Sequence, residues 1–487
     1  MSAAGPLPRR SPPQPSGEGT PASAARPPEG ALHRSAQHEG NALNTLKQLA
    51  ALLLGLLLAW GGAANAQTLP DKSRDKTLGV VTCASSLCHG SIAGWNGSPV
   101  TQNEYVVWSR LDKHARAYSL LLNERSRRIA ANLALPQPAH QSKICLDCHA
   151  HNPVAAAPAH SVADGVSCEA CHGPATRWIA AHTEPGATHR SNIGNGLYPS
   201  AQPLARAKLC LSCHFGTSDK YVTHRIMAAG HPRMSFEMET FTSLQPAHFK
   251  VDADYLQRKG HFDGVKVWAV GQAVAVATQI DILLDPKRGR DGVFPELTLF
   301  DCHACHHPMA DTRWKPVGNF GRSISPGLVR LNDSGMLMLR LLLRQTDPPL
   351  AERFSGAVVQ LNQAIAGGGD LGERALAVKA LADEAARTIS ASGVSNDNLR
   401  AMALALVDDG LAGAYSDYAG AEQAAMALGS LVNTLHKLGQ LKSAAALNKG
   451  LADLRAALRY DEAFKPADFQ TRLRTFRPLV ATPLATR

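Results

Sequence analysis

The chain has 487 residues, ten cysteines and a formal net charge of +10, with 45% hydrophobic and 18% charged residues. This length allows about two to four domains, and the apolar fraction excludes wholesale disorder. The excess of 50 Lys and Arg over 40 Asp and Glu points to nucleic acid, an acidic membrane surface or an anionic partner, while aromatic residues are scarce at 5%.

The first 66 residues predict a leader and an export signal. Residues 1–42 are rich in Pro, Ser, Ala and Gly without apolar periodicity, which is typical of a disordered segment. Within residues 43–66, an apolar run of about a dozen residues follows Lys47 and ends in Ala-Asn-Ala, so we expect a signal peptide cleaved after Ala66. The run is shorter than the roughly 20 residues of a membrane anchor. We expect no later stretch to span a membrane and therefore place the mature protein, exported and soluble, in the periplasm.

The position of the signal raises a hypothesis about the start of translation. A signal peptide begins close to the first residue, whereas about 42 residues precede this one. We therefore expect the true start near Leu43, at a non-Met codon, with Met1 an artefact of start-site assignment. Tryptic peptides from residues 11–34 in a cell lysate would contradict this hypothesis.

The ten cysteines form five pairs, and a histidine follows each pair. Four pairs read C-x-x-C-H, the attachment signature of c-type haem, in which two thiols bond the porphyrin vinyl groups and the histidine becomes the proximal iron ligand. The first pair has four intervening residues instead of two and is the least certain haem site, with a Cys83–Cys88 disulfide as its alternative. The five sites are Cys83/Cys88/His89, Cys145/Cys148/His149, Cys168/Cys171/His172, Cys210/Cys213/His214 and Cys302/Cys305/His306.

Three other interpretations of the cysteines fit less well. Disulfides suit an oxidising compartment but give no reason for a histidine after every pair. Structural zinc uses two Cys-x-x-Cys pairs per site, and five pairs do not divide evenly into such sites. A thioredoxin-like redox motif needs one pair near a βαβ pattern, which is absent from the sequence. We therefore predict five covalently attached haem c groups.

The sixth ligand of each iron decides between an electron carrier and an enzyme. A residue one to three positions from a proximal histidine cannot reach the other porphyrin face, so His151, His303 and His307 can serve only a neighbouring haem. Local context, such as nearby aromatic residues or a Gly-Pro turn, favours His114, His182, His224 and His231 as distal ligands. The other histidines that could serve are His140, His160, His189, His248 and His261.

Several stretches resemble multihaem cytochromes of the cytochrome c-554 type. The resemblance rests on Gly165-Val-Ser-Cys-Glu-Ala-Cys-His-Gly-Pro174 with Trp178 and His182 behind it, on residues 108–118, and on Ala229-Gly-His-Pro-Arg-Met-Ser-Phe-Glu237. It covers roughly residues 80–310 and implies a mainly helical, loop-rich periplasmic fold with stacked haems, largely bis-histidine ligated. Its relatives include electron carriers and catalytic multihaem enzymes. The family core is tetrahaem, whereas this chain offers five sites and a long haem-free tail.

The organisation of the mature chain follows from these sites. Residues 67–310 form the predicted multihaem domain, in which residues 265–284 read as one helix between the fourth and fifth sites. Residues 328–475 hold no cysteine and show apolar stripes at helical spacing, for example Leu428, Leu431, Val432 and Leu435. We predict a bundle of about five or six helices there, with breaks at Asp347-Pro-Pro349, residues 367–369 and Gly439. The expected fold class is mainly α.

Two functions compete at this stage. The first is an electron carrier whose irons all have two protein ligands, serving redox partner proteins and a membrane-bound respiratory complex. The second is an oxidoreductase with one open haem position that acts on a small nitrogen or sulfur compound. A weaker interpretation makes the chain a structural subunit of a respiratory assembly. Haem propionates offset much of the Lys and Arg excess, which removes nucleic acid from the expected partners.

Overall fold

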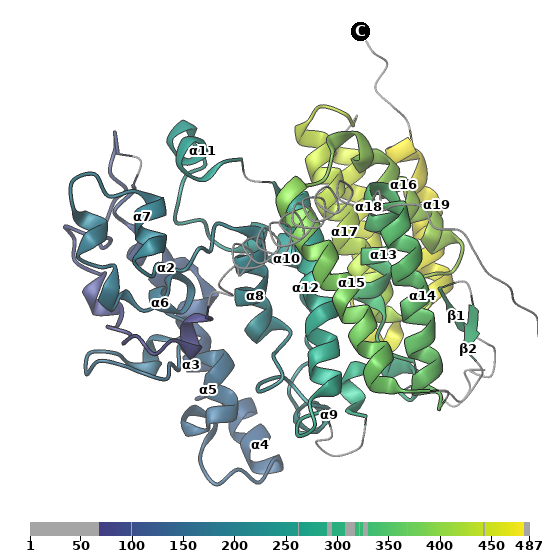
Figure 1. The fold of residues 1–487 in the computed structure, drawn as a ribbon, viewed down its shortest axis with the longest axis horizontal. Coiled ribbons are helices and arrows are strands. Elements are labelled where there is room, and N and C mark those ends of the chain that lie inside the picture. Colours follow the sequence, from purple (N-terminus) through teal and green to yellow (C-terminus); the bar gives the residue numbers. More distant parts are fainter. Residues whose placement is uncertain are drawn as a thin grey trace, which may run out of the picture. The chain divides into compact units, whose positions relative to one another are not determined.

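The computed structural model describes residues 68–98, 100–261, 263–289, 295–306, 317–320, 322–324, 330–367, 369–441 and 444–481. The predicted leader (residues 1–42) and signal peptide (43–66) lie outside these residues. The fold is mainly α, as the sequence predicts (Figure 1). One short antiparallel hairpin joins β1 (Val317–Asn319) to β2 (Arg322–Ile324), with Gly318 opposite Ser323.

The part of the chain that carries the cysteine pairs consists of short helices separated by 3₁₀ turns and loops. Its longest α-helix before the fifth attachment site is α12, and the others have four to twelve residues. Their bounds are α2 Glu104–Leu111, α3 Ala117–Leu120, α4 Glu124–Asn132, α5 Lys143–His149, α6 Cys168–His172, α7 His189–Gly194, α8 Pro203–His214, α9 His224–Ala228, α10 Met238–Leu244 and α11 Ala253–Lys259.

The predicted helix at residues 265–284 is α12 (Gly264–Leu284), which begins where the Asp263 side chain accepts the backbone N–H of Lys266 at 3.0 Å. It is apolar on all sides, which is typical of a buried helix. Within the described residues, the stretch Ala253–Leu284, which includes α11 and α12, has the length and composition of a membrane span. However, 78% of its apolar window is buried inside the fold, which is typical of a core helix.

Seven helices follow in the described residues after position 330, more than the five or six expected. Their bounds are α13 Ser334–Thr346, α14 Pro348–Ile365, α15 Leu371–Ser392, α16 Leu399–Leu411, α17 Tyr418–Lys437, α18 Ala444–Ala456 and α19 Pro466–Ala481. The breaks lie where the sequence predicts them. Asp347 ends α13 and caps α14 by accepting the backbone N–H of Leu350 at 3.1 Å, and Gly439 follows α17 with a φ of 69°.

The main hydrophobic core runs from α8 and α10 through α12 into the helices after residue 330. The helix α10 approaches α12 closely at Gly271, where a Cβ atom would lie 2.3 Å from the Met238 Cγ. The division into a multihaem domain (residues 67–310) and a helical domain (residues 328–475) stays a prediction. Helix α12, although it lies within residues 67–310, packs in the same core as the helices after residue 330.

Buried apolar side chains are sparse around the first three cysteine pairs. Apart from the main core, the described residues form two clusters, each with three buried members: Leu121, Ala130 and Ala139 in one, and Leu133, Ile226 and Ala229 in the other. Side chains alone therefore fill little of this region, in keeping with the low content of aromatic residues.

Candidate haem-binding sites

All ten cysteines lie in described residues and are free of disulfide bonds, including Cys83 and Cys88. In three of the five sites the C-x-x-C-H segment forms the last turns of a helix, because α5, α6 and α8 end at His149, His172 and His214. Residues three apart share one helix face, so both thiols of such a site lie on the same side.

The widened first site lies in a turn rather than a helix. Cys83 follows η2 (Val80–Thr82), and the Cys88 N–H donates to the Ser85 carbonyl at 2.9 Å. The His89 N–H then donates to the carbonyl of Cys83 at 3.2 Å. This fold-back brings His89 next to the first cysteine despite the two additional residues.

The fifth site also lies in a turn, although its spacing is the ordinary C-x-x-C-H. It begins at η9 (Cys302–Ala304), and the N–H groups of Cys305 and His306 both donate to the Cys302 carbonyl, at 3.2 and 2.8 Å. The other three C-x-x-C-H sites lie on the α-helices α5, α6 and α8, whereas this one lies on a 3₁₀ turn. The same spacing therefore does not always produce the same local structure.

Two of the ten predicted anchors differ from the rest in their exposure. Cys88 and Cys305 are exposed, whereas the other eight cysteines are partly buried. Both are the second cysteine of a site built on a turn, where no helix turn covers the thiol. The C-x-x-C-H pattern is the same at four sites and predicts no difference between their cysteines. In the structure, Cys305 is nevertheless more exposed than the cysteines of the other three. The role of Cys305 as a thioether anchor stays a prediction.

Each of the five predicted proximal histidines lies opposite one other histidine, and no histidine is used twice. The ring centroids within a pair are 5.9–6.4 Å apart. Four partners are the histidines that local context favours, and the fifth is His248. The pairs are His89 with His182, His149 with His231, His172 with His248, His214 with His114, and His306 with His224.

This separation matches two imidazoles on opposite faces of one iron. With metal–nitrogen bonds of about 2 Å, the two ligating nitrogens are about 4 Å apart and the ring centroids, each about 1 Å further back, are about 6 Å apart. Rings in direct stacking contact can lie closer, as His214 does to Phe236, at 4.4 Å. Each site thus has two thiols and a pair of imidazoles separated by the distance that two axial ligands of one iron require. This set of donor groups fits haem.

Hydrogen bonds orient several of these rings. The Nδ1 atom of His89 lies 2.9 Å from the Glu104 carboxylate, and that of His114 lies 2.9 Å from Asp112. The Nδ1 atoms of His149 and His231 lie 3.2 and 2.8 Å from backbone carbonyl oxygens. Because Nδ1 carries the proton that these acceptors bind, Nε2 keeps its lone pair for a metal. The sequence alone did not identify Glu104 and Asp112 as site residues.

One further histidine pair lacks this arrangement. His151 and His160 lie 5.4 Å apart, and neither follows a cysteine pair directly. The Nε2 atom of His160 lies 3.0 Å from the His151 carbonyl, so a hydrogen bond occupies that ring nitrogen. Of the other candidates, His140 contacts Tyr118 edge-on and His261 is exposed. The predicted neighbour ligand His307 lies outside the described residues.

Burial keeps the interior imidazoles neutral. Desolvation lowers the pKa of His172 to about 3 and that of His214 to about 4, with smaller contributions from neighbouring histidines. In both cases removal from water disfavours the charged form. The neutral imidazole is the form that binds a metal, so these side chains need no proton release near pH 7 before ligation.

The attachment sites adjoin one another out of chain order. The Cys83 side chain contacts Cys168, which joins the first site to the third, and Cys148 contacts Cys213, which joins the second to the fourth. The Lys220 ammonium lies 3.7 Å from the Cys213 sulfur and is paired with Asp71 at 2.8 Å. Sites that are distant in sequence therefore lie within side-chain contact.

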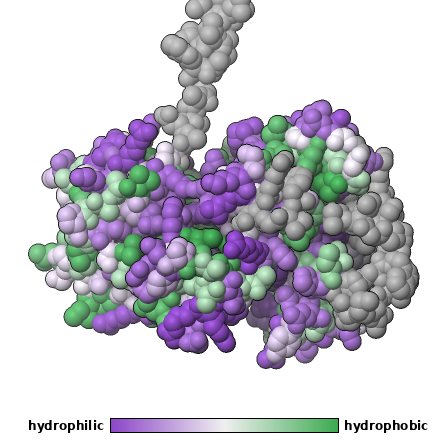
Figure 2. Space-filling model, turned by 90° about the horizontal axis from the view of Figure 1, so that it is seen from below, coloured by the Kyte–Doolittle hydropathy of each residue, from purple (hydrophilic) through white to green (hydrophobic). Residues whose placement is uncertain are grey.

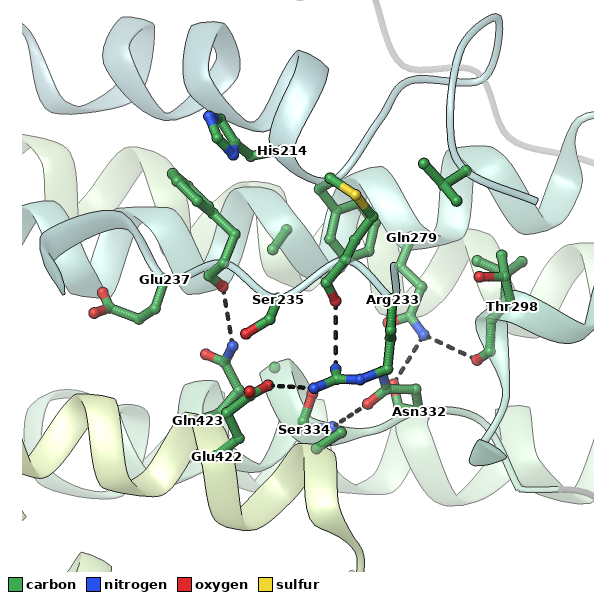
Figure 3. A pocket seen from close by; sticks show the side chains of 18 of the residues that line it. His214, Arg233, Ser235, Glu237, Gln279, Thr298, Asn332, Ser334, Glu422 and Gln423 are labelled. Carbon is green, nitrogen blue, oxygen red and sulfur yellow. Dashed lines mark hydrogen bonds and ion pairs between the residues drawn. The ribbon is translucent and has the colours of Figure 1, made fainter. Parts of the chain in front are cut away.

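A pocket beside the fourth and fifth sites has walls from both parts of the chain (Figure 3). His214 and Cys302 line it together with Glu422 and Gln423 of α17. Arg233 crosses it, pairing with Glu422 at 2.9 Å and lying 4.8 Å from the centre of the Tyr418 ring. The Gln423 side-chain N–H₂ donates to the Phe236 carbonyl at 3.0 Å. Helix α17 thus helps to enclose the Cys302 end of the fifth attachment site.

The comparisons with known proteins match this picture. Residues 74–173 match the family described as cytochrome c554 and c-prime. This segment of the chain is therefore similar to c-type cytochromes of the cytochrome c-554 type. No curated protein and no solved structure matches the chain. The family match supports covalently bound haem c and a role in electron transfer.

The matched cytochrome c-554-type region covers only part of the candidate sites. It includes the first three cysteine pairs and ends just after His172. The fourth and fifth cysteine pairs, Cys210/Cys213 and Cys302/Cys305, lie beyond it, as do all helices from α8 onward. The assignment of haem to these two sites therefore depends on their C-x-x-C-H spacing and on their histidine pairs.

Proposed function

We propose that this protein is an exported multihaem cytochrome that carries single electrons through five covalently attached haems in a periplasmic respiratory chain. Bound haem supplies a one-electron ferric/ferrous iron couple. The protein supplies the thioether anchors, the two axial imidazoles of each iron and the surroundings that tune its reduction potential. Redox proteins, including a membrane-bound respiratory complex, are the proposed donors and acceptors, and nucleic acid is not among them.

The observation that carries this proposal is the one-to-one pairing of the histidines. Five proximal histidines face five different histidines at 5.9–6.4 Å. With both axial positions held by imidazole, an iron has no free position for a substrate. This pattern supports an electron carrier over the alternative of an oxidoreductase with one open site.

Contacts between the sites support transfer of electrons from one haem to the next. The thiols of sites one and three touch, as do those of sites two and four. His214, which faces His114 at the fourth site, also interacts electrostatically with His149 of the second site. Axial ligands held by Glu104, Asp112 and backbone carbonyls keep their orientation when the iron changes its charge.

The cellular location in this proposal follows from the N-terminal sequence alone. The apolar run and the Ala-Asn-Ala site before residue 67 are typical of a cleaved signal peptide. Covalent attachment of haem to free thiols is also consistent with export. Mass spectrometry of the purified protein tests this part directly, because cleavage after Ala66 leaves Gln67 at the N-terminus.

Low-temperature EPR of the oxidised protein, combined with a pyridine haemochrome count, tests the function. We expect five haems per chain and only low-spin ferric signals. Three histidine pairs have ring planes 77–88° apart, and two have planes 17° and 34° apart. We therefore expect highly anisotropic signals from the first group and rhombic signals from the second.

The outcomes separate the alternatives. A stoichiometric high-spin signal would contradict the electron carrier with two histidines on every iron and favour the oxidoreductase. A count of four haems would remove one of the two turn-based sites, and peptide mapping of the attached haems then shows whether Cys83–Cys88 or Cys302–Cys305 is bare. A lower count would contradict the attachment argument.

A further inference from the structure

Positive charge is concentrated in one short segment of the chain. Residues 110–143 contain seven Lys and Arg against two Asp and Glu, whereas residues 330–481 contain 17 against 16. One of the two acidic residues, Asp112, is buried and interacts with His114 and Gln245. The other, Glu124, is paired with Arg127 at 2.7 Å. Lys143 is paired with Asp147, just beyond the segment, at 2.6 Å, so the excess of positive charge comes from the other basic side chains.

The seven basic side chains are all exposed and come from neighbouring elements. We call them the basic face: Arg110, Lys113, Arg116, Arg125, Arg127, Arg128 and Lys143. They lie on or beside α2, α3, α4 and the start of α5, and α3 packs against α5. In Figure 1, α3 and α5 lie between α2, which is beside α6, and α4 at the lower edge of the haem-bearing part.

Exposed apolar side chains lie among these charges. Leu111 is 60% exposed, Leu120 52%, Leu122 46% and Ile144 37%. Figure 2 shows hydrophobic residues set among hydrophilic ones on the side of the haem-bearing part that it displays. Protein interfaces commonly combine an apolar centre with a polar or charged rim.

The basic face adjoins the second haem site. Helix α5 carries Cys145 and Cys148, and the ring of His149 is bonded to the carbonyl of Ala117 in α3. On the other side of the iron position, Arg125 donates to the Gly230 carbonyl at 3.0 Å, directly before His231. Both proposed ligands of this site are therefore positioned by the elements that carry the basic face.

We propose that the basic face docks an acidic redox protein and that electrons cross this interface through the haem attached at Cys145 and Cys148. This inference depends on the proposed function, because it needs a haem at the second site. Complementary charge accelerates association of electron-transfer partners, and the exposed leucines give the docked complex a dry contact.

An anionic membrane surface is the competing occupant of a basic and partly apolar face. The position of the face favours a protein, because electron transfer needs the partner's cofactor close to a haem. A lipid surface carries no redox cofactor, so its binding would not depend on the adjacent haem site. The haem-bearing protein is also close to neutral as a whole, so attraction of an acidic partner depends on this local charge.

The test measures reduction of the holoprotein by a reduced plant-type [2Fe–2S] ferredoxin, an acidic redox protein, in a stopped-flow experiment. The double variant Arg110→Glu with Arg128→Glu reverses two charges of the basic face. The matched control, Arg387→Glu with Arg474→Glu, makes the same change in net charge at exposed positions of α15 and α19. None of the four residues is a proposed haem ligand.

We expect the second-order rate constant at low salt to fall on the order of tenfold in the first variant and little in the control. The rate constant of the wild type should also decline steeply with ionic strength. Equal rates in the two variants would overturn the docking proposal. Reduction of all haems by dithionite in both variants shows that the haem chain is intact, so failure of docking is distinguishable from failure of the proposed function.

Vesicles decide between the two kinds of surface. The protein could co-sediment with phosphatidylglycerol-containing vesicles in the control variant but not in the basic-face variant. That result would overturn the proposal of a protein partner and favour a membrane surface. Absence of binding to both these and pure phosphatidylcholine vesicles, together with the rate difference, supports the protein partner.

Discussion

At the scale of single residues, the anchors of the cofactor follow from local spacing, whereas their partners follow from the fold. Two thiols and a histidine within five residues, or within seven at the first site, identify each attachment site without knowledge of tertiary structure. The opposing histidine comes from a distant segment, so sequence context only ranks candidates. His248 shows the limit. Its neighbours in sequence gave no reason to prefer it to His140 or His189, and its position opposite His172 appears only in the folded chain.

The environment of an anchor is likewise a property of the fold. The same C-x-x-C-H spacing gives partly buried thiols on α5, α6 and α8 but an exposed Cys305 in the turn at the fifth site. Spacing fixes which atoms can reach the porphyrin vinyl groups, whereas the surrounding elements fix the local backbone structure of each site.

The pairing of His248 with His172 can be tested by substitution. We expect His248→Ala to convert one low-spin iron to the high-spin state, because His172 would remain as the only protein ligand at that site. EPR of the oxidised protein measures this change. The haem count should stay the same, since the thioether bonds of Cys168 and Cys171 are unaffected.

Replacement of the exposed His261 by alanine is the matched control and should leave the spectrum unchanged. A low-spin spectrum in His248→Ala equal to that of the wild type would remove His248 from the ligand set. A high-spin signal in His261→Ala would show that the assignment of the pair is wrong.

At the scale of elements, the accuracy of prediction depends on how much apolar periodicity a segment contains. Helix α17 is long enough for its stripe of leucines to be read, and most of the residues of α12 are apolar. Helices of four to nine residues, such as α3 and α4, hold too little periodicity to be placed, and few buried side chains lie beside them. The contact of α10 with α12 also has no local signal, because it depends on a glycine meeting a distant methionine.

That contact predicts a stability effect. A Cβ at Gly271 would lie 2.3 Å from the Cγ and 2.7 Å from the Cβ of Met238, which is 2% exposed and has little room to move. We expect Gly271→Ala to lower the free energy of unfolding by about 1–3 kcal/mol, because overpacking outweighs the gain in helix propensity. Guanidinium unfolding monitored by circular dichroism measures the change.

Gly356 in α14 is the matched control, because a Cβ there would meet no heavy atom within 4 Å. Gly356→Ala should raise the free energy of unfolding by about 0.5–1 kcal/mol. A Gly271→Ala variant as stable as Gly356→Ala would show that α10 can shift away from α12 without cost.

At the scale of the whole molecule, bound haems would offset the positive net charge that the amino-acid composition gives. Residues 67–487 contain 45 Lys and Arg against 37 Asp and Glu. Each haem contributes about −1 when oxidised and about −2 when reduced, from two propionates and the charged iron porphyrin. With five haems the net charge is about +3 in the oxidised protein and about −2 in the reduced protein.

The sign of this charge is measurable. We expect the purified protein to migrate slowly toward the cathode at pH 7 when oxidised and toward the anode when reduced with dithionite. Capillary electrophoresis in both states gives the mobility. Strong cathodic migration that survives reduction would contradict five haems on a chain that begins at Gln67.

Helix α12 has a consequence for the proposed export of this chain. If the unfolded chain crosses the inner membrane, the apolar length of α12, which forms the centre of the core, resembles a stop-transfer segment during that crossing. Gln272 and Gln279 bond Gln423 and the Asn332 carbonyl in the fold, and during translocation the same two polar side chains disfavour escape into lipid. In that case, the two glutamines that form hydrogen bonds in the folded protein would also help the unfolded chain to avoid insertion into the membrane.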